Sequence, residues 1–143
     1  MKLVRKSMLM LAATLSMFSL PVLSHHSFAA EFDRNKPVTL EGTVTKVEWQ
    51  NPHTRVYIDV TDISSKVVSW ELELASPNGL IRAGWSRHTL QGGEKITVRG
   101  FLAKDGSNLA NANSILLNGK LILSETTKNG EPDETYKSDP NAK

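Results

Sequence analysis

The chain has 143 residues, no cysteine, and 17 basic against 15 acidic side chains. Three of the basic residues, Lys2, Arg5 and Lys6, lie in the first 24 residues, which contain no acid, so residues 25–143 hold 14 basic and 15 acidic side chains. A net charge of −1 lacks the basic surplus typical of nucleic-acid-binding proteins, so we expect no nucleic acid as a partner. The lack of cysteine excludes disulfides, a thiol nucleophile and a lipid anchor on cysteine.

The first 24 residues have the pattern of a signal peptide. A positive head precedes an apolar run at 8–20, and Val22 and Ser24 stand at the positions that a signal peptidase reads. The run is shorter than the ~20 residues needed to span a bilayer. We therefore expect a periplasmic or secreted protein that begins at His25 and is not embedded in a membrane.

The remainder divides into an arm at 25–37, a domain at 38–123 and a tail at 124–143. The tail is rich in charged residues, Ser, Thr, Asn and Pro, and Tyr136 is its only sizeable apolar side chain. Such a segment cannot bury enough apolar surface to offset its ordering entropy, so we expect disorder there. The central residues suffice for one small domain with one core.

The first half of the domain alternates apolar and polar residues, as strands do. Strands are predicted at 38–49, 55–60 and 67–74. Within the first, the apolar parity shifts between Val44 and Val47, which predicts a β-bulge that bends the strand.

A short helix follows, with Ser76 as its N-cap and Pro77 at its first position. Leu80, Ile81 and Trp85 recur at helical spacing.

Three further strands are predicted at 95–102, 112–117 and 120–123. The last two are joined by Asn118-Gly119, the strongest short-range hairpin signal.

Three strands, a helix and then two or three strands predict a mainly β fold. The order is that of a small OB-like Greek-key barrel of five or six strands, with one short helix between strands 3 and 4. A plain five- or six-stranded sandwich gives similar alternation and remains the alternative.

Four separated motifs carry a resemblance to a known group of proteins: HHSFAAEFD at 25–33, LEGTV at 40–44, WQNPH at 49–53 and AKDGS at 103–107. With these the chain resembles an uncharacterised family of small exported bacterial proteins. The resemblance implies export and a small β-barrel, and it implies no activity.

A metal site is one functional hypothesis. Cleavage before His25 would leave its α-amine and imidazole on one residue, a nitrogen pair that suits copper(II) or zinc. The thirteen residues 25–37 can span up to ~40 Å, so His53 is within reach as a third ligand. His26 or His88 is the reserve ligand. A simpler variant of the site uses only the α-amine together with the amide and the ring of His26.

The alternative for these histidines is a solvated linker at 25–26 and a turn-capping role for His53. His88 follows the short helix, and we expect it to be an exposed loop residue or a charge partner of the helix C-terminus.

A ligand surface is the second hypothesis. The loop after the first strand contains Asn51 and His53, and OB-type folds bind ligands at this loop and the neighbouring strands. Trp49 and Tyr57 flank it and could supply stacking surface, although core packing is the default for Trp49, Trp70 and Trp85. The partner would be a small ligand, a glycan or a protein.

Signals of catalysis are few, and no catalytic residue is assigned. Glu71 and Glu73 share one strand face, where ion pairs with Lys46, Arg55 or Arg99 are the expected role. No nucleophile elbow, phosphate loop or zinc-protease motif is present. Among the three functional classes, an enzyme is the least favoured.

Overall fold

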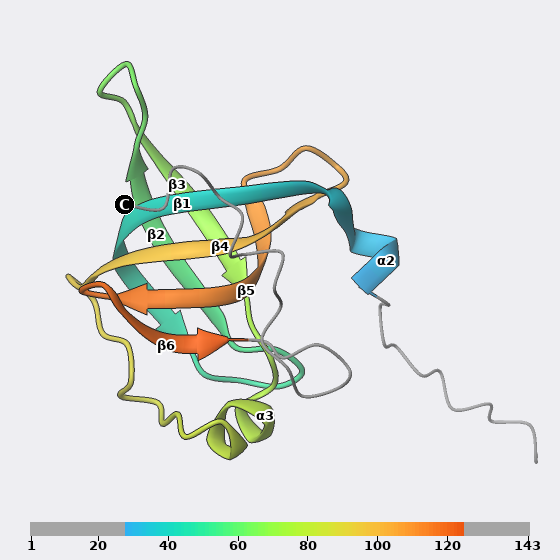
Figure 1. Cartoon of the computed structure of the whole chain (residues 1–143), viewed down its shortest axis with the longest axis vertical. Coiled ribbons are helices and arrows are strands. Elements are labelled where there is room, and N and C mark those ends of the chain that lie inside the picture. The colour runs from blue at the N-terminus through green and yellow to red at the C-terminus, as the bar shows by residue number, and fades with distance from the viewer. Residues whose placement is uncertain (1–27, 125–143) are drawn as a thin grey trace, which may run out of the picture.

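The computed structural model describes residues 28–124, which form a closed β-barrel with two short helices (Figure 1). The predicted signal peptide, most of the predicted tail, His25 and His26 lie outside these residues. The elements in chain order are α2 (Phe28–Glu31), β1 (Phe32–Glu48), β2 (Arg55–Thr61), β3 (Val67–Glu73), α3 (Pro77–Arg82), β4 (Lys95–Ala103), β5 (Leu109–Leu117) and β6 (Lys120–Ser124).

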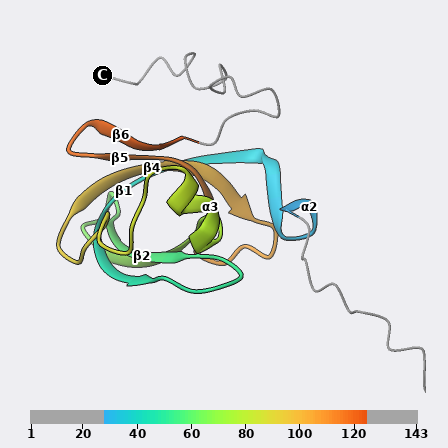
Figure 2. The same ribbon diagram turned by 90° about the horizontal axis from the view of Figure 1, so that it is seen from below.

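The strand order confirms the predicted OB-like barrel. Neighbouring strands follow the order β3-β2-β1-β4-β5-β6, and a parallel pairing between β3 and β5 closes the ring. α3 lies between β3 and β4 in the chain and covers one end of the barrel (Figure 2). Closure leaves β1, β2, β3 and β4 with partners along most of their length. A ligand would therefore meet the outward faces and loops of these strands rather than free strand edges.

β1 is longer than the sequence indicates, and it is bent as predicted. The register with β2 shifts between Val44 and Lys46, which confirms the bulge. The strand begins at Phe32 rather than Val38, because the Phe32 side chain is buried and the residue pairs with Ala103 of β4. The predicted arm at 25–37 is therefore, from Phe28 onward, a helical turn followed by the start of the sheet.

The core confirms the packing role of the three tryptophans. Trp85 is buried in the main cluster, while Trp49 and Trp70 are half-buried against it. The predicted helical stripe is wrong at its end: α3 stops at Arg82, Ile81 is exposed, and Trp85 lies beyond the helix. The Trp85 indole instead donates a hydrogen bond to the Ile122 carbonyl at 2.6 Å, tying this segment to β6. No helix within 28–124 is long and apolar enough to cross a membrane.

The last hairpin forms where it is predicted. Asn118 and Gly119 both have positive φ, 51° and 78°, as a two-residue hairpin turn between right-twisted strands requires. β5 begins at Leu109, three residues earlier than expected, because 109–111 pair in parallel with 71–73 of β3.

Candidate functional site

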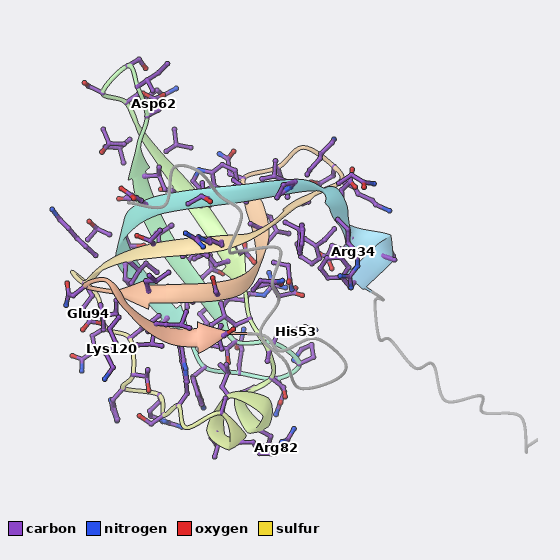
Figure 3. All side chains as sticks on the ribbon, viewed as in Figure 1. Arg34, His53, Asp62, Arg82, Glu94 and Lys120 are labelled. Carbon is purple, nitrogen blue, oxygen red and sulfur yellow. The ribbon has the colours of Figure 1, made fainter. Side chains whose placement is uncertain are left out.

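The loop at 49–54 connects β1 to β2 and is fastened to the chain that follows β3. The Thr54 amide donates to the Ala75 carbonyl at 3.1 Å, and the Leu74 amide donates to the Thr54 carbonyl at 2.9 Å. The Asn51–Pro52 peptide bond is cis. The loop is thus held against the segment 74–75 that leads into α3, and His53 stands at this junction (Figure 3).

One imidazole nitrogen of His53 is held by the backbone. Its Nδ1 lies 3.1 Å from the Leu74 carbonyl oxygen, and a carbonyl can only accept, so Nδ1 carries the proton. In the neutral ring Nε2 therefore keeps its lone pair. The side chain is 40% exposed.

The carboxylate of Glu73 lies beside this nitrogen and is unusually covered for an outward-facing group. Its Oε1 is 3.9 Å from His53 Nε2, its Oε2 is 3.8 Å from Arg55 Nη2, and only 8% of the side chain is exposed. Arg55 also forms an ion pair with Glu71 through Nη1. One guanidinium therefore serves two carboxylates, as the fork geometry of arginine allows.

The same face continues to Tyr57. Its hydroxyl donates to Glu48 Oε2 at 3.2 Å, and Lys46 forms an ion pair with Glu48 while its Nζ lies 5.4 Å from the Tyr57 ring centroid. The hydrogen bond that Lys46 donates to Glu48 holds the pKa of Glu48 below its ordinary value, and the same hydrogen bond raises the pKa of Lys46.

These groups meet because of strand register. We call them the paired-charge face, made of His53 and the side chains that sit opposite one another on β1, β2 and β3: Lys46, Glu48, Arg55, Tyr57, Glu71 and Glu73. Arg55 pairs with Glu73 across one ladder and with Glu48 across the other, and Tyr57 pairs with Glu71 and Lys46. Opposite charges facing each other across a sheet stabilise it and fix the side chains.

The structure places the predicted ligand residues at different depths. His53 and Tyr57 both belong to the paired-charge face. Asn51 is exposed in the loop, and Trp49 is half-buried against the core. Ion pairing was expected for Arg55, Glu71 and Glu73, yet not a place beside His53. The cross-strand register that joins them carries no local sequence signal.

Apart from the reserve ligand His88, only one of the predicted metal ligands lies within the residues that the structure describes. His25 and His26 lie outside residues 28–124, and His53 lies inside. Across 28–124, no group of three or more His, Cys, Asp or Glu side chains could hold a metal ion. His88 is an exposed loop residue, as predicted.

Chemically, the paired-charge face offers fixed donors and acceptors rather than reactive groups. His53 Nε2 and the carboxylates accept hydrogen bonds, the Arg55 guanidinium donates them, and Tyr57 adds an amphipathic ring. Arg55 is 35% exposed, so it can reach a ligand without leaving its carboxylates. Such an array suits binding of a polar molecule.

Two solved structures have a similar fold at low sequence identity. The N-terminal domain of PriB protein from Thermoanaerobacter tencongensis is 18% identical, with a TM-score of 0.43 over 58% of this chain and 96% of that one. The mitochondrial single-stranded DNA binding protein Rim1 of S. cerevisiae is 11% identical, with a TM-score of 0.44 over 57% and 93%. The strand order and the β3–β5 pairing establish the OB-like barrel independently of these two similarities. No curated protein matches the chain.

One expectation from composition is corrected by these structures. Nucleic acid was excluded as a partner because the charge of residues 25–143 is near zero, yet proteins of this fold include a single-stranded DNA binding protein. The exclusion, which rested on net charge alone, was wrong. The similarity itself assigns no partner to this chain.

The sequence match identifies the family. The family of unknown function DUF6152 matches residues 13–112, more than half of the chain. Its uncharacterised status agrees with the resemblance noted from the four motifs, and the match contributes no activity. The chain therefore belongs to DUF6152, a family of unknown function whose fold is here an OB-like barrel.

Proposed function

We propose that the protein is exported and acts as a binding module, which holds a glycan on the paired-charge face beside the loop at 49–54. The observation that carries this proposal is the group around His53: an imidazole fixed at Nδ1, unprotonated at Nε2, and flanked by a covered carboxylate and a half-exposed guanidinium. Sugar hydroxyls both donate and accept, so they match alternating acceptors and donors held at fixed positions.

The fold supports this location. In OB-type barrels the faces of strands 2 and 3 and the adjoining loops bind oligonucleotides and oligosaccharides. Tyr57 lies on β2, just after this loop, and a tyrosine ring of this kind adds apolar contact to a sugar ring. Because the charges are already fixed by one another, little side-chain entropy would be lost on binding.

The test is titration of the protein with maltotetraose, cellotetraose and chitotetraose, followed by NMR of the backbone amides. We expect at least one of them to shift amides at 49–57 and 71–74, and the variants His53→Ala and Tyr57→Ala to weaken binding by roughly tenfold. His88→Ala is the matched control, since His88 is exposed and lies outside this face. Absence of binding at millimolar concentrations, or binding only of a tetrathymidylate, would refute the glycan proposal.

A copper site is the second candidate, and two observations favour it. His53 has the arrangement of a metal-ligating histidine, with Nδ1 donating to a backbone carbonyl and Nε2 available. In addition, Phe28 is anchored on Phe101, with ring centroids 5.8 Å apart. Phe101 pairs with Asn111, which pairs with Glu73, so Glu73 is two strands from that anchor.

Two strand spacings amount to about 10 Å, and the three residues from His25 to Phe28 can extend over about the same length. A mature amino terminus at His25 could therefore supply its amine and ring to a copper ion next to His53. Mass spectrometry of the exported protein tests the start, and Cu(II) titration tests the site. We expect one tight equivalent, abolished by one added N-terminal residue and weakened by His53→Ala. A start other than His25 would rule the site out.

A further inference from the structure

A polar hollow of about 450 Å³ lies on the outward face of β1, β2 and β4, beside the β5–β6 turn. Its polar side chains come from three strands: Glu41, Thr43, Asp59, Thr61, Lys95 and Thr97. Asn118 and Gly119 of the turn complete the wall. Figure 3 shows Lys120 at this turn on the side of the barrel away from His53. The hollow shares no residue with the paired-charge face, and the two surfaces adjoin on β2, where Asp59 is the next outward residue after Tyr57.

Three features of the backbone lie at or next to this hollow. A Cβ on Gly42 would lie 2.7 Å from the Asp59 carbonyl oxygen, so β1 and β2 approach more closely there than a larger residue permits. β1 then bends at the bulge after Val44, and the positive φ of Asn118 turns β6 back along β5. Gly42 and Asn118 line the hollow, and the bulge follows directly along β1.

The charges of the hollow are separated from one another. Asp59 and Lys95 both pair with Thr43, on its two sides, so one neutral residue stands between the opposite charges. In residues 28–124, none of the ion pairs involves Glu41, Asp59 or Lys95. The Ser69 hydroxyl donates to one oxygen of Asp59 at 2.6 Å. The carboxylates and the ammonium thus remain available to a ligand.

We propose that this hollow binds a short zwitterionic peptide, with its amino end at Asp59 and its carboxylate at Lys95. Asp59 and Lys95 stand two strand spacings apart, about 10 Å. An extended tripeptide spans about the same length, at 3.3–3.6 Å per residue. The charges of the peptide ends therefore complement the two ends of the hollow. This site does not depend on the proposed function.

The lining between the charges suits peptide groups. Thr43, Thr61 and Thr97 each offer a hydroxyl that can donate or accept, which matches the N–H and C=O groups of a peptide backbone. No aromatic side chain lines the hollow, so it lacks the stacking surface that usually accompanies a sugar ring. A volume of about 450 Å³ lies within the range of small-molecule sites.

The experiment is an NMR titration of the protein with trialanine, N-acetyltrialanine and trialaninamide. We expect trialanine to shift amides of 41–43, 59–61 and 95–97 with millimolar affinity. Blocking either end removes one charge contact, and each blocked peptide should bind roughly three- to tenfold more weakly.

Two variants test which residues of the hollow bind each end of the peptide. In Lys95→Gln, trialanine and trialaninamide should bind equally, because the partner of the carboxylate is gone, while N-acetylation still weakens binding. In Asp59→Asn, the reverse is expected. Lys66→Gln, on an exposed hairpin residue, is the matched control and should bind as the unmodified protein does. The proposal is overturned if trialanine does not bind, if its affinity ignores both end groups, or if the shifted amides lie elsewhere.

Discussion

The paired-charge face and the polar hollow are built from the same residue types on the same barrel, and they differ in register. On the paired-charge face, Arg55 stands directly opposite Glu73, so their charges meet. In the hollow, Thr43 stands between Asp59 and Lys95, so theirs do not. The strand register thus decides whether two opposite charges form an ion pair that stabilises the fold or remain available to a ligand.

The difference in exposure sharpens this contrast. Glu73 is 8% exposed, whereas Glu41 and Lys95 are open to solvent. A covered carboxylate depends on its cation, because an unpaired charge away from water is unfavourable. An exposed carboxylate is hydrated and needs no protein partner. Substitutions should thus affect stability on one face and binding alone on the other.

The largest effect is expected for Arg55→Ala. The substitution leaves Glu71 and Glu73 as neighbouring carboxylates with no shared guanidinium, and Glu73 is covered. Breaking such a pair from one side costs about 3 kcal/mol when fully buried, and about 2 kcal/mol is reasonable for a guanidinium one-third exposed. Lys95→Ala should change the free energy of unfolding by less than about 0.5 kcal/mol.

Urea denaturation of both variants at neutral pH measures the comparison, and Arg87→Ala on an exposed loop is the control for loss of an arginine. Equal destabilisation by Arg55→Ala and Lys95→Ala would show that the two faces do not differ in this way.

A smaller effect is expected in double-mutant cycles. The Arg55 and Glu73 substitutions should be coupled by about 1–2 kcal/mol, since the side chains are in contact. Asp59 and Lys95 are separated by a strand, so their substitutions should add to within about 0.5 kcal/mol. The variants Glu73→Gln and Asp59→Asn keep the side-chain shape and make the cycles comparable. Strong coupling in the hollow would mean that its charges already interact and are not free.

The fold could be predicted where its signals are local. The parity shift after Val44, the cap at Ser76 and the Asn118-Gly119 turn each constrain a few adjacent residues, and the structure has each of them in place. The early start of β1 could not be predicted, because Phe32 joins the sheet through Ala103, about seventy positions away. The parallel pairing of β3 with β5 also joins residues far apart in sequence, such as Glu71 and Leu109.

The candidate sites follow the same rule. His53 could be predicted as a loop residue from the pattern around it, but its contact with Glu73 depends on how β2 and β3 align. The hollow has no sequence signal, since it joins residues of β1, β2 and β4 to the turn at Asn118. In the sequence its charged residues look like those of an ordinary solvated sheet face. Only the strand register shows that Asp59 and Lys95 do not face each other.

The pH dependence of the paired-charge face gives a third prediction. The pKa of Glu48 is lowered, mainly by the hydrogen bond from Lys46. Its contribution to stability is therefore complete above the ordinary carboxyl pKa and is lost as the pH falls through the lowered value. Lys46→Gln should return the Glu48 pKa toward its ordinary value. The free energy of unfolding should then depend less on pH in this acidic range. Carboxyl NMR titration measures the pKa, with Lys66→Gln as control. An unchanged Glu48 pKa in Lys46→Gln would exclude this pairing.

Tyr57→Phe should have the smallest effect. The Tyr57 hydroxyl also lowers the pKa of Glu48, by a hydrogen bond that contributes less than the one from Lys46. The Glu48 pKa should therefore rise in Tyr57→Phe by less than in Lys46→Gln, and it should rise furthest when both are changed. The same NMR titration distinguishes these cases. If Tyr57→Phe moved the pKa more than Lys46→Gln did, the tyrosine rather than the lysine would be the principal partner of Glu48. The ion pair would then hold this part of the face less firmly than its geometry implies.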